Sequence, residues 1–461
     1  MLDAFESEDS EFVAVYGRRR VGKTYLIRET FDYKFTFQHS GLANSTRAKQ
    51  LKAWRSSLGE YGFKVKRNPT NWMDAFALLK ELIKNSDEPK KVVFIDELPW
   101  MDTRSSGLIP ALENFWNSWA SARKDVLLII CGSATSWIIN KIVKNRGGLH
   151  NRVDCKIPLR PFTLRECELY MKSRKVNLSR RQLTEGYMIM GGIPFYWKAM
   201  QKGLSLAQNI DRNFFSEDGE FYEEFDALYA SLFKKPDSYI KIVSLLSCKR
   251  SGLTRNELIK SGGFVDNGTF GQMLKDLESC GFIRSYAAPG KEKKDALFQL
   301  MDPFTIFYYE FICGNSRRDA QQWSHSLNTV TYKTWCGLSF ERVCLLHAEQ
   351  IKQALGISGV ISGVYSWRSA ASSPGAQVDM VIDRSDDVVD LCEMKYTAAP
   401  LQMTSADADD FRRKAEVFAT ETGTGKAIHS VLVSACGVVR NEYSDELQRV
   451  LTLEDLFKEI N

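Results

Sequence analysis

The sequence contains no long hydrophobic run and no clustered cysteines. Its longest apolar stretches, such as Val126–Gly132, are far shorter than the roughly 20 residues of a membrane-spanning helix, so we expect no membrane segment. The acidic start lacks the basic and apolar regions of a signal peptide. The ten cysteines form no CxxC pair and no Cys/His grouping at zinc spacing, which favours reduced thiols over disulfides or a zinc site. We therefore expect a cytoplasmic protein.

A strong charge of either sign is also missing. The net charge of +5 is only mildly basic, which permits nucleic-acid binding without arguing for it. The hydrophobic content of 44% and the charged content of 26% are typical of a globular protein. Because 461 residues exceed one ordinary core, we expect two or three domains at least.

A phosphate-binding pattern lies near the start of the chain. An apolar strand, Phe12–Tyr16, precedes Gly17-x4-Gly22-Lys23-Thr24 and a helical run, which is the strand–loop–helix order of a P-loop. In such a loop, backbone N–H groups surround the phosphates, the lysine reaches the β- and γ-phosphates, and the hydroxyl binds Mg²⁺. The predicted ATP-binding residues are Gly17, Arg18, Arg19, Arg20, Val21, Gly22, Lys23, Thr24 and Tyr25.

A second acidic pattern complements this loop. Val92–Ile95 is an uninterrupted apolar run, as expected for a central parallel strand, and it ends in Asp96 and Glu97. Open α/β sheets bind ligands at the carboxyl ends of their strands. We expect Asp96 to hold Mg²⁺ and Glu97 to polarise the attacking water.

A third apolar strand leads to two further candidate groups. It ends near Ser133 and Thr135, and either hydroxyl can sense the γ-phosphate or simply begin the next turn. A later glycine-containing loop carries Arg146 and Arg152. We favour Arg152 as the arginine that completes the transition state in its own or a neighbouring subunit, against the alternative of an ordinary solvated arginine.

Helical patterns separate these strands, which predicts an α/β fold with a parallel sheet. The stretches "YGRRRVGKT", "FIDELPWM", "GSATSW" and "GGIPFYW" resemble the archaeal and bacterial ATPase family within the AAA+ and STAND NTPases. This resemblance implies an ATPase core over residues 1–160 and a helical lid over 161–232, with a hinge at Gly191–Pro194. Such ATPases usually have a longer segment before the P-loop strand that helps to hold adenine. Here base recognition is expected from elsewhere, or the sequence is shortened at its start.

The next segment, residues 233–302, has the pattern of a winged helix-turn-helix. We expect helices at Asp237–Cys248, Thr254–Lys260 and Asn267–Cys280, then a β-hairpin with the basic tip "PGKEKK". Seven basic residues against two acids between residues 234 and 260 favour contact with DNA phosphates. A protein-docking role is the alternative. The third helix is poor in base-reading side chains, so sequence-specific recognition is not expected.

Residues 303–461 contain an α-β-β-β-α-β order with Glu341 in the first helix. Asp379 on one strand and Glu393-x-Lys395 on the next fit the pattern of PD-(D/E)XK nucleases, which implies a restriction-endonuclease-like fold. Residues i and i+2 share one face of a strand, so Glu393 and Lys395 are expected to project together. Asp379 and Glu393 would then bind Mg²⁺ or Mn²⁺, Lys395 would orient water or stabilise charge, and Glu341 would assist the metal. The proline that usually precedes the first acid is absent.

Two functions remain open at this level. The first is an ATP-binding and hydrolysing protein whose nucleotide state controls a Mg²⁺-dependent DNA nuclease domain, in defence or mobile-element biology. The second is a non-cleaving ATPase switch that binds DNA or a protein partner through the winged helix and a degenerate nuclease-like domain. A homo-oligomer is compatible with both, since an Arg152 that acts on a neighbouring subunit requires one.

Overall fold

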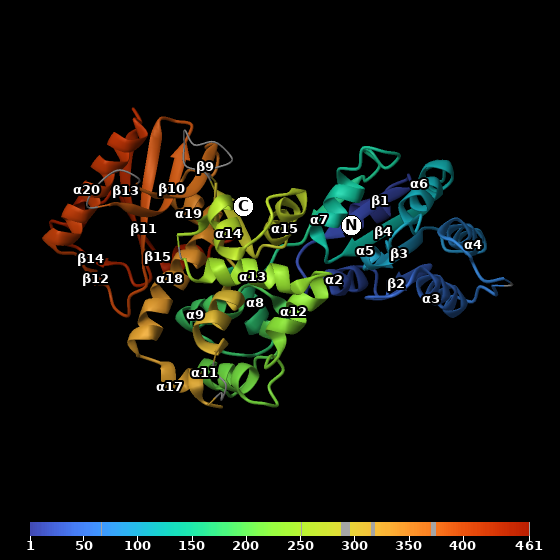
Figure 1. Ribbon diagram of the computed structural model, residues 1–461, viewed down its shortest axis with the longest axis horizontal. Coiled ribbons are helices and arrows are strands. Elements are labelled where there is room, and N and C mark those ends of the chain that lie inside the picture. The colour runs from blue at the N-terminus through green and yellow to red at the C-terminus, as the bar shows by residue number, and fades with distance from the viewer. Residues whose placement is uncertain (66, 250, 287–295, 315–318, 370–374, 461) are drawn as a thin grey trace. The chain divides into compact units, whose positions relative to one another are not determined.

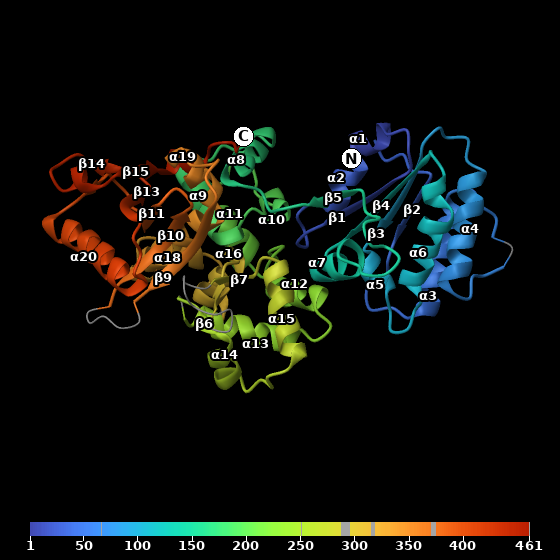
Figure 2. The ribbon, with the colours of Figure 1, turned by 90° about the horizontal axis from the view of Figure 1, so that it is seen from above.

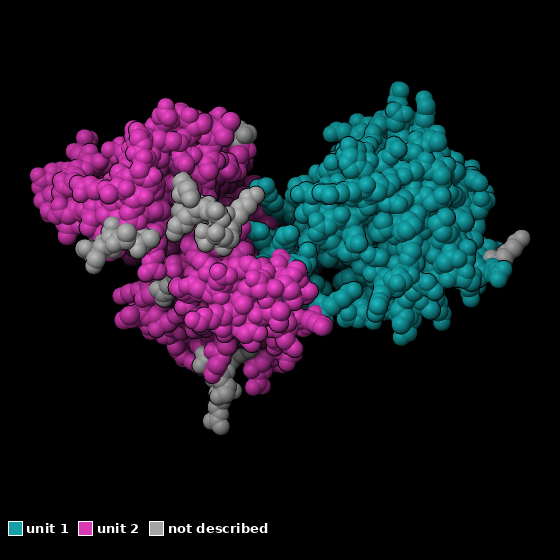
Figure 3. Space-filling view, turned by 45° about the horizontal axis from the view of Figure 1, so that its top comes forward, with its two compact units in different colours: residues 1–160, 230–234, 272–280 teal, residues 161–229, 235–271, 281–461 magenta. Residues whose placement is uncertain are grey.

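The computed structural model describes residues 1–65, 67–249, 251–286, 296–314, 319–369 and 375–460. It divides into two compact units, coloured separately in Figure 3. Unit 1 comprises residues 1–160, 230–234 and 272–280, and unit 2 comprises residues 161–229, 235–271 and 281–461. The predicted domain boundaries at residues 160, 232 and 302 stay predictions. None of the helices in the described ranges combines the length and the hydropathy needed to cross a membrane.

Unit 1 is built around a five-stranded sheet in the order β2-β3-β4-β1-β5, with every neighbouring pair parallel (Figure 1). The strands are β1 (Glu11–Tyr16), β2 (Phe37–Ser40), β3 (Lys91–Asp96), β4 (Val126–Gly132) and β5 (Cys155–Pro158). β4 is buried along its whole length, as an apolar central strand should be. The predicted parallel α/β fold is therefore confirmed for this part of the chain.

Helices cover both faces of the sheet in unit 1 (Figure 2). One face packs against α3, α4 and α6 through a large apolar cluster that includes Trp54, Phe76 and Trp116. The other face packs against α2 and α1 through residues such as Ile27 and Phe31. The helices are α1 (Leu2–Glu6), α2 (Lys23–Thr30), α3 (Arg47–Glu60), α4 (Trp72–Lys84), α5 (Leu98–Met101), α6 (Leu108–Ser118) and α7 (Thr135–Ile138).

Unit 2 begins with short helices around the predicted hinge. α9 ends at Met190 and α10 begins at Pro194, so the helix breaks where the sequence predicted. Gly192 is required there because a Cβ would lie 1.8 Å from the carbonyl oxygen of Phe162. The helices are α8 (Leu164–Ser173), α9 (Arg180–Met190), α10 (Pro194–Lys198), α11 (Leu206–Ile210) and α12 (Glu224–Leu232).

The predicted winged-helix segment contains three helices and a small antiparallel sheet in the order β6-β8-β7. Thr254 caps its second helix and forms the predicted capping box with Glu257. The predicted basic tip, Pro289–Lys294, lies outside the described residues, as does Arg250. The winged-helix assignment therefore stays a prediction. The elements are α13 (Pro236–Ser247), β6 (Leu253–Thr254), α14 (Arg255–Gly262), α15 (Gly268–Ser279), β7 (Ile283–Tyr286) and β8 (Leu297–Leu300).

The C-terminal sheet of unit 2 has the order β15-β13-β11-β10-β9. β9, β10 and β11 are antiparallel neighbours, whereas β13 and β15 run parallel to β11. Phe418 of α20 packs into the apolar cluster on one sheet face, and α18 packs against β11. Its strands are β9 (Ser362–Arg368), β10 (Gln377–Arg384), β11 (Val388–Lys395), β13 (Ala427–Ser434) and β15 (Arg449–Thr452). A separate parallel pair is formed by β12 (Leu401–Gln402) and β14 (Val438–Val439).

Two consecutive helices precede this sheet, and Glu341 lies in the first of them. They are α18 (Val330–Leu346) and α19 (Ala348–Leu355), which meet at His347. The buried His347 ring donates from Nδ1 to the carbonyl of Val343 and accepts the backbone N–H of Leu164 at Nε2. These contacts fix the ring at the break. The remaining helices of unit 2 are α16 (Pro303–Phe307), α17 (Gln322–Ser326), α20 (Ser405–Thr422) and α21 (Leu453–Leu456).

Candidate functional site

The glycine loop of unit 1 connects β1 to α2 and holds its lysine inside. Lys23 is buried, and its Nζ donates to the carbonyls of Gly17 (3.0 Å) and Arg18 (2.9 Å) and to Ser133 Oγ (3.0 Å). Burial lowers the pKa of Lys23, and nearby acidic groups, including Glu97, oppose this shift. The lysine therefore sits among oxygen acceptors at the point where a phosphate is expected.

The ends of two strands bring the predicted Mg²⁺ residues together. Thr24 Oγ1 donates to Asp96 Oδ2 over 2.9 Å, so the α2 hydroxyl and the β3 carboxylate are direct neighbours. The thiol of Cys131 donates to Asp96 Oδ1 over 2.7 Å, and its burial raises its pKa, which keeps it a donor. The contact of Cys131 with Asp96 cannot be recognised from the sequence, because a cysteine in an apolar strand resembles an ordinary core residue.

Glu97 adopts a strained backbone immediately after β3. Its φ of 46° lies in the left-handed region, which is uncommon for a residue other than glycine and recurs at functional sites. Its carboxylate accepts the Oγ–H of Ser133 (2.8 Å) and the backbone N–H of Ser133 (3.1 Å). Ser133 thus connects Glu97 to Lys23, whereas the Thr135 hydroxyl contacts only the carbonyl of Ser133 at 3.5 Å among the contacts described.

The loop has the form that a nucleotide phosphate requires. A Cβ added at Gly22, whose φ is 92°, would meet nothing within 4 Å, so there is open space beside the loop. Thr24 and Asp96 offer the oxygen ligands that Mg²⁺ prefers. The residues present therefore fit ATP and Mg²⁺. Of the other predicted loop residues, Arg18 and Val21 are buried, Arg19 and Arg20 are half-buried, and Tyr25 is exposed.

The predicted arginine lies apart from this group. Arg152 is exposed in the turn before β5, and within the described ranges no hydrogen bond or ion pair joins its side chain to the loop residues. Arg146 is also exposed. The structure brings Lys23, Thr24, Asp96, Glu97 and Ser133 together, and the role of Arg152 stays a prediction.

A second candidate site lies in unit 2, where β10 and β11 pair. Met380 lies opposite Cys392, and the backbone N–H of Met394 donates to Asp379 Oδ2 over 3.0 Å, so Asp379 and Glu393 are neighbours. Burial raises the pKa of both carboxyls, and the charge of Asp379 raises that of Glu393 further. Glu393 is buried and Asp379 is half-buried, and neighbouring acids with raised pKa values are typical of functional sites.

The amine that contacts Glu393 belongs to a residue that the sequence did not single out. Lys414 of α20 lies 2.7 Å from Glu393 Oε2 and 3.0 Å from Asp410. Lys395 is exposed at the end of β11, close enough to lower the pKa of both acids, yet no hydrogen bond or ion pair of its side chain is found in the described part of the chain. Sequence reasoning missed Lys414, because its place above the sheet depends on how α20 packs.

Asp379 and Glu393 offer carboxylate oxygens of the kind that bind a divalent metal ion. The buried Glu393 Oε1 has no hydrogen-bond partner in the structure, which leaves one carboxylate oxygen ready for a ligand. Glu341 of α18 lines the same cavity as Asp379 and lies 3.7 Å from Arg342. Across the ranges described, however, no three His, Cys, Asp or Glu side chains gather closely enough to hold a metal ion. The chain therefore offers a carboxylate pair with a free oxygen, not a complete ligand cage.

Comparison with known proteins defines the class of unit 1. Residues 1–199 match the family described as "ATPase domain predominantly from Archaea", which is fewer than half of the 461 residues. This part of the chain is an archaeal-type P-loop ATPase domain, which confirms the sequence resemblance for these residues.

Other similarities extend over more of the chain. An uncharacterised protein of Methanocaldococcus jannaschii, MJECL04, is 22% identical over 344 residues, covering 74% of this chain and 73% of that protein. The Walker-type ATPase paby2304 of Pyrococcus abyssi gives a TM-score of 0.44 at 15% identity and covers 66% of this chain and 92% of its own. The ORC2 protein of Aeropyrum pernix gives 0.39 at 14% identity, covering 75% and 92%. Similarity this low says nothing about the activity of this chain.

Proposed function

We propose that this protein is a P-loop ATPase of the AAA+ type whose nucleotide state controls a metal-dependent DNA nuclease domain in its C-terminal part. The observation that carries this proposal is the pair of the buried Glu393 and the half-buried Asp379, in which Glu393 Oε1 has no hydrogen-bond partner among the described residues. A fold retains such a costly pair when a cation or a proton is needed there. A role in defence or mobile-element biology agrees with an ATP-gated nuclease.

On the ATPase side, Lys23 would bind the β- and γ-phosphates, and Thr24 with Asp96 would hold Mg²⁺. Glu97 would orient the attacking water, since its carboxylate already lies beside Ser133 and the lysine. Mg²⁺ supplies charge stabilisation at the phosphates when it is bound. An Arg152 that completes a neighbouring subunit's site would require a homo-oligomer, which mass measurement with and without an ATP analogue would detect.

On the nuclease side, Asp379 and Glu393 would hold Mg²⁺ or Mn²⁺, with Glu341 at the edge of the same cavity. A bound metal polarises the phosphodiester and activates water. Lys414 would orient Glu393 through its 2.7 Å contact, and the exposed Lys395 would be free to reach a substrate phosphate.

The test is DNA cleavage with and without ATP. Purified protein is incubated with Mg²⁺ or Mn²⁺ and plasmid, linear or single-stranded DNA, and Glu393→Ala combined with Lys395→Ala serves as the matched variant. We expect cleavage by the wild type that depends on nucleotide and is lost in the variant. Equal nicking by both proteins would contradict the assignment.

A second candidate is the non-cleaving switch, and one observation favours it. Lys414 already forms an ion pair with Glu393, so the acid has a cationic partner without any metal. In that case the C-terminal part binds DNA or a protein through the predicted winged helix. DNA binding that responds to ATP, with no cleavage under any metal condition, would support this function over the nuclease.

A further inference from the structure

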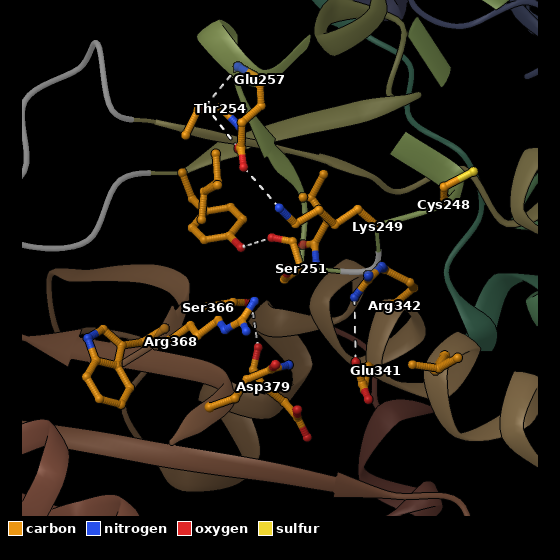
Figure 4. Close-up of a pocket in the computed structure, with 17 residues that line it drawn as sticks. Cys248, Lys249, Ser251, Thr254, Glu257, Glu341, Arg342, Ser366, Arg368 and Asp379 are labelled. Atoms are coloured by element: carbon orange, nitrogen blue, oxygen red, sulfur yellow. Dashed lines mark hydrogen bonds and ion pairs between the residues drawn. The ribbon is translucent and has the colours of Figure 1, made fainter. Parts of the chain in front are cut away.

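Unit 2 contains a cavity of about 670 Å³ beside the acidic pair (Figure 4). Its wall comes from two parts of the unit that are distant in sequence. Thr254, Glu257 and Lys249 lie on one side in Figure 4, and Asp379 and Glu341 lie on the opposite side. A ligand in this cavity would therefore touch both the predicted winged-helix segment and the predicted nuclease residues.

Cations lie between these two sides. Arg368 and Arg342 line the cavity in Figure 4, close to Asp379 and Glu341 respectively. Arg368 is exposed at the end of β9, and in the described part of the chain its side chain has no ion pair or hydrogen bond. Lys249 is paired with Glu257 at 3.0 Å, but both side chains are more than 40% exposed, so that pair is weak. Arg368 and Lys249 are therefore accessible to an anion, whereas Arg342 is buried and lies 3.7 Å from Glu341.

A further buried arginine increases the positive charge behind the wall. Arg284 donates to Gln299 Oε1 (2.8 Å) and Ser366 Oγ (2.5 Å), both of which line the cavity. Burial and then the charge of Arg342 lower the pKa of Arg284 to about 10. Glu341 lies 3.7 Å from Arg342 and offsets part of this positive charge. Ser366 in turn donates to the Asp379 carbonyl at 2.6 Å, so this wall also positions the acid.

The size of the cavity and its aromatic lining limit the kind of anion. The cavity volume of about 670 Å³ falls in the range of about 300–1,000 Å³ that is typical of small-molecule sites. A cavity of this size can hold a nucleotide but is too small for a duplex. Tyr286 lines the cavity, and aromatic rings are the usual stacking platforms for unpaired bases. Trp367 also lines it, but its ring is buried against Phe418 of α20. Arginine forks match phosphate oxygens.

We propose that this cavity binds a short single-stranded segment of a polynucleotide, with its phosphates on Arg368 and Lys249 and a base against Tyr286. The bound phosphodiester would then face Asp379. This inference rests on the proposed function, because it names the substrate of that site. Duplex DNA would enter only where its strands separate.

The experiment measures binding without cleavage. A fluorescently labelled single-stranded 20-mer, as DNA and as RNA of the same sequence, and the matching duplex are titrated in EDTA by fluorescence polarisation. We expect the single strand to bind at least tenfold more tightly than the duplex, and Arg368→Gln to weaken single-strand binding by about tenfold. Preference between the DNA and RNA strands identifies the natural polymer.

The salt dependence distinguishes a phosphate contact from a structural effect. The slope of log Kd against log salt should fall by about 0.7 for Arg368→Gln and by about 1.4 when Lys249→Gln is added. Arg440→Gln is the matched control, since Arg440 is an exposed arginine elsewhere in unit 2 that pairs with Asp445. Equal affinities of Arg368→Gln and Arg440→Gln, or duplex binding as tight as single-strand binding, would overturn the inference.

These outcomes separate the inference from the proposed function. Single-strand binding that depends on Arg368, without cleavage in Mg²⁺ or Mn²⁺, keeps the cavity as a polynucleotide site and removes the nuclease. Cleavage that depends on Glu393, with single-strand binding unaffected by Arg368→Gln and Lys249→Gln, keeps the nuclease and removes this cavity as its substrate site.

Discussion

Ser133 is expected to matter for ATP hydrolysis far more than Thr135, although both follow the same strand. The Ser133 hydroxyl accepts from Lys23 Nζ (3.0 Å) and donates to Glu97 Oε1 (2.8 Å), so it connects the phosphate-binding lysine to the residue expected to orient water. The Thr135 hydroxyl has only a 3.5 Å contact to a backbone carbonyl, at the outer limit of a hydrogen bond. We therefore compare Ser133→Ala with Thr135→Val.

The size of the effect follows from these contacts. A hydrogen bond to a charged group contributes about 1.5–3 kcal/mol, which corresponds to a loss of about 10- to 150-fold in kcat/KM. The backbone N–H of residue 133 still donates to Glu97 (3.1 Å) in the alanine variant, so part of the orientation remains. We expect a loss near tenfold for Ser133→Ala and less than about threefold for Thr135→Val.

The assay is phosphate release at saturating Mg²⁺ and ATP, with nucleotide affinity measured separately by a fluorescent ATP analogue. For Ser133→Ala we expect kcat to fall while affinity changes little, because Lys23 retains its contacts to the loop carbonyls. If Thr135→Val loses as much activity as Ser133→Ala, or if neither changes, the connection through Ser133 does not contribute to catalysis.

Three further predictions concern the ATPase loop, the His347 break and the hinge. Lys23→Ala should weaken ATP binding by about 100-fold, which isothermal titration measures. Glu97→Gln should bind ATP normally and retain it unhydrolysed, which isothermal titration and analysis of the bound nucleotide check. Burial lowers the pKa of His347 to about 4. As the pH falls, His347 in the unfolded chain takes up a proton before His347 in the folded protein does. The free energy of unfolding, which has its full value above pH 6.5, therefore falls by about 2 kcal/mol at pH 5. Urea unfolding at pH 7.5 and pH 5 measures this loss, and a smaller loss is expected for His347→Gln. Gly192→Ala would place a Cβ 1.8 Å from a backbone oxygen, so its melting temperature should drop well below that of Gly337→Ala, which adds a Cβ within α18 that meets nothing within 4 Å.

The geometry of unit 1 followed closely from the sequence because its determinants are local. A glycine loop between a strand and a helix places Lys23 and Thr24 at one sheet edge, and a buried parallel strand brings Asp96 to the same edge. What the sequence left open was the choice between Ser133 and Thr135. That choice depends on how the chain turns after β4, where a change of two residues decides whether a hydroxyl faces Lys23 or a carbonyl.

In unit 2 the strand spacing predicted the acids but not their cationic partner. Asp379 and Glu393 are neighbours because β10 and β11 are joined by a short turn, which fixes their register. Glu393 shares its strand period with Val389 and Leu391, which pack with Phe418 of α20, so its carboxylate faces a largely apolar layer. A carboxylate directed into such a layer requires a cation from the same layer.

Lys414 meets this need because it lies on the helix that covers the layer, four residues before Phe418. Lys395 is the exposed last residue of β11, where its long flexible side chain can extend into solvent, away from the acids. The Glu-x-Lys spacing therefore fixes which strand face the lysine starts from, but helix packing decides which amine reaches Glu393. For the same reason strand spacing alone does not reveal Lys414, and the role of Lys395 stays a prediction.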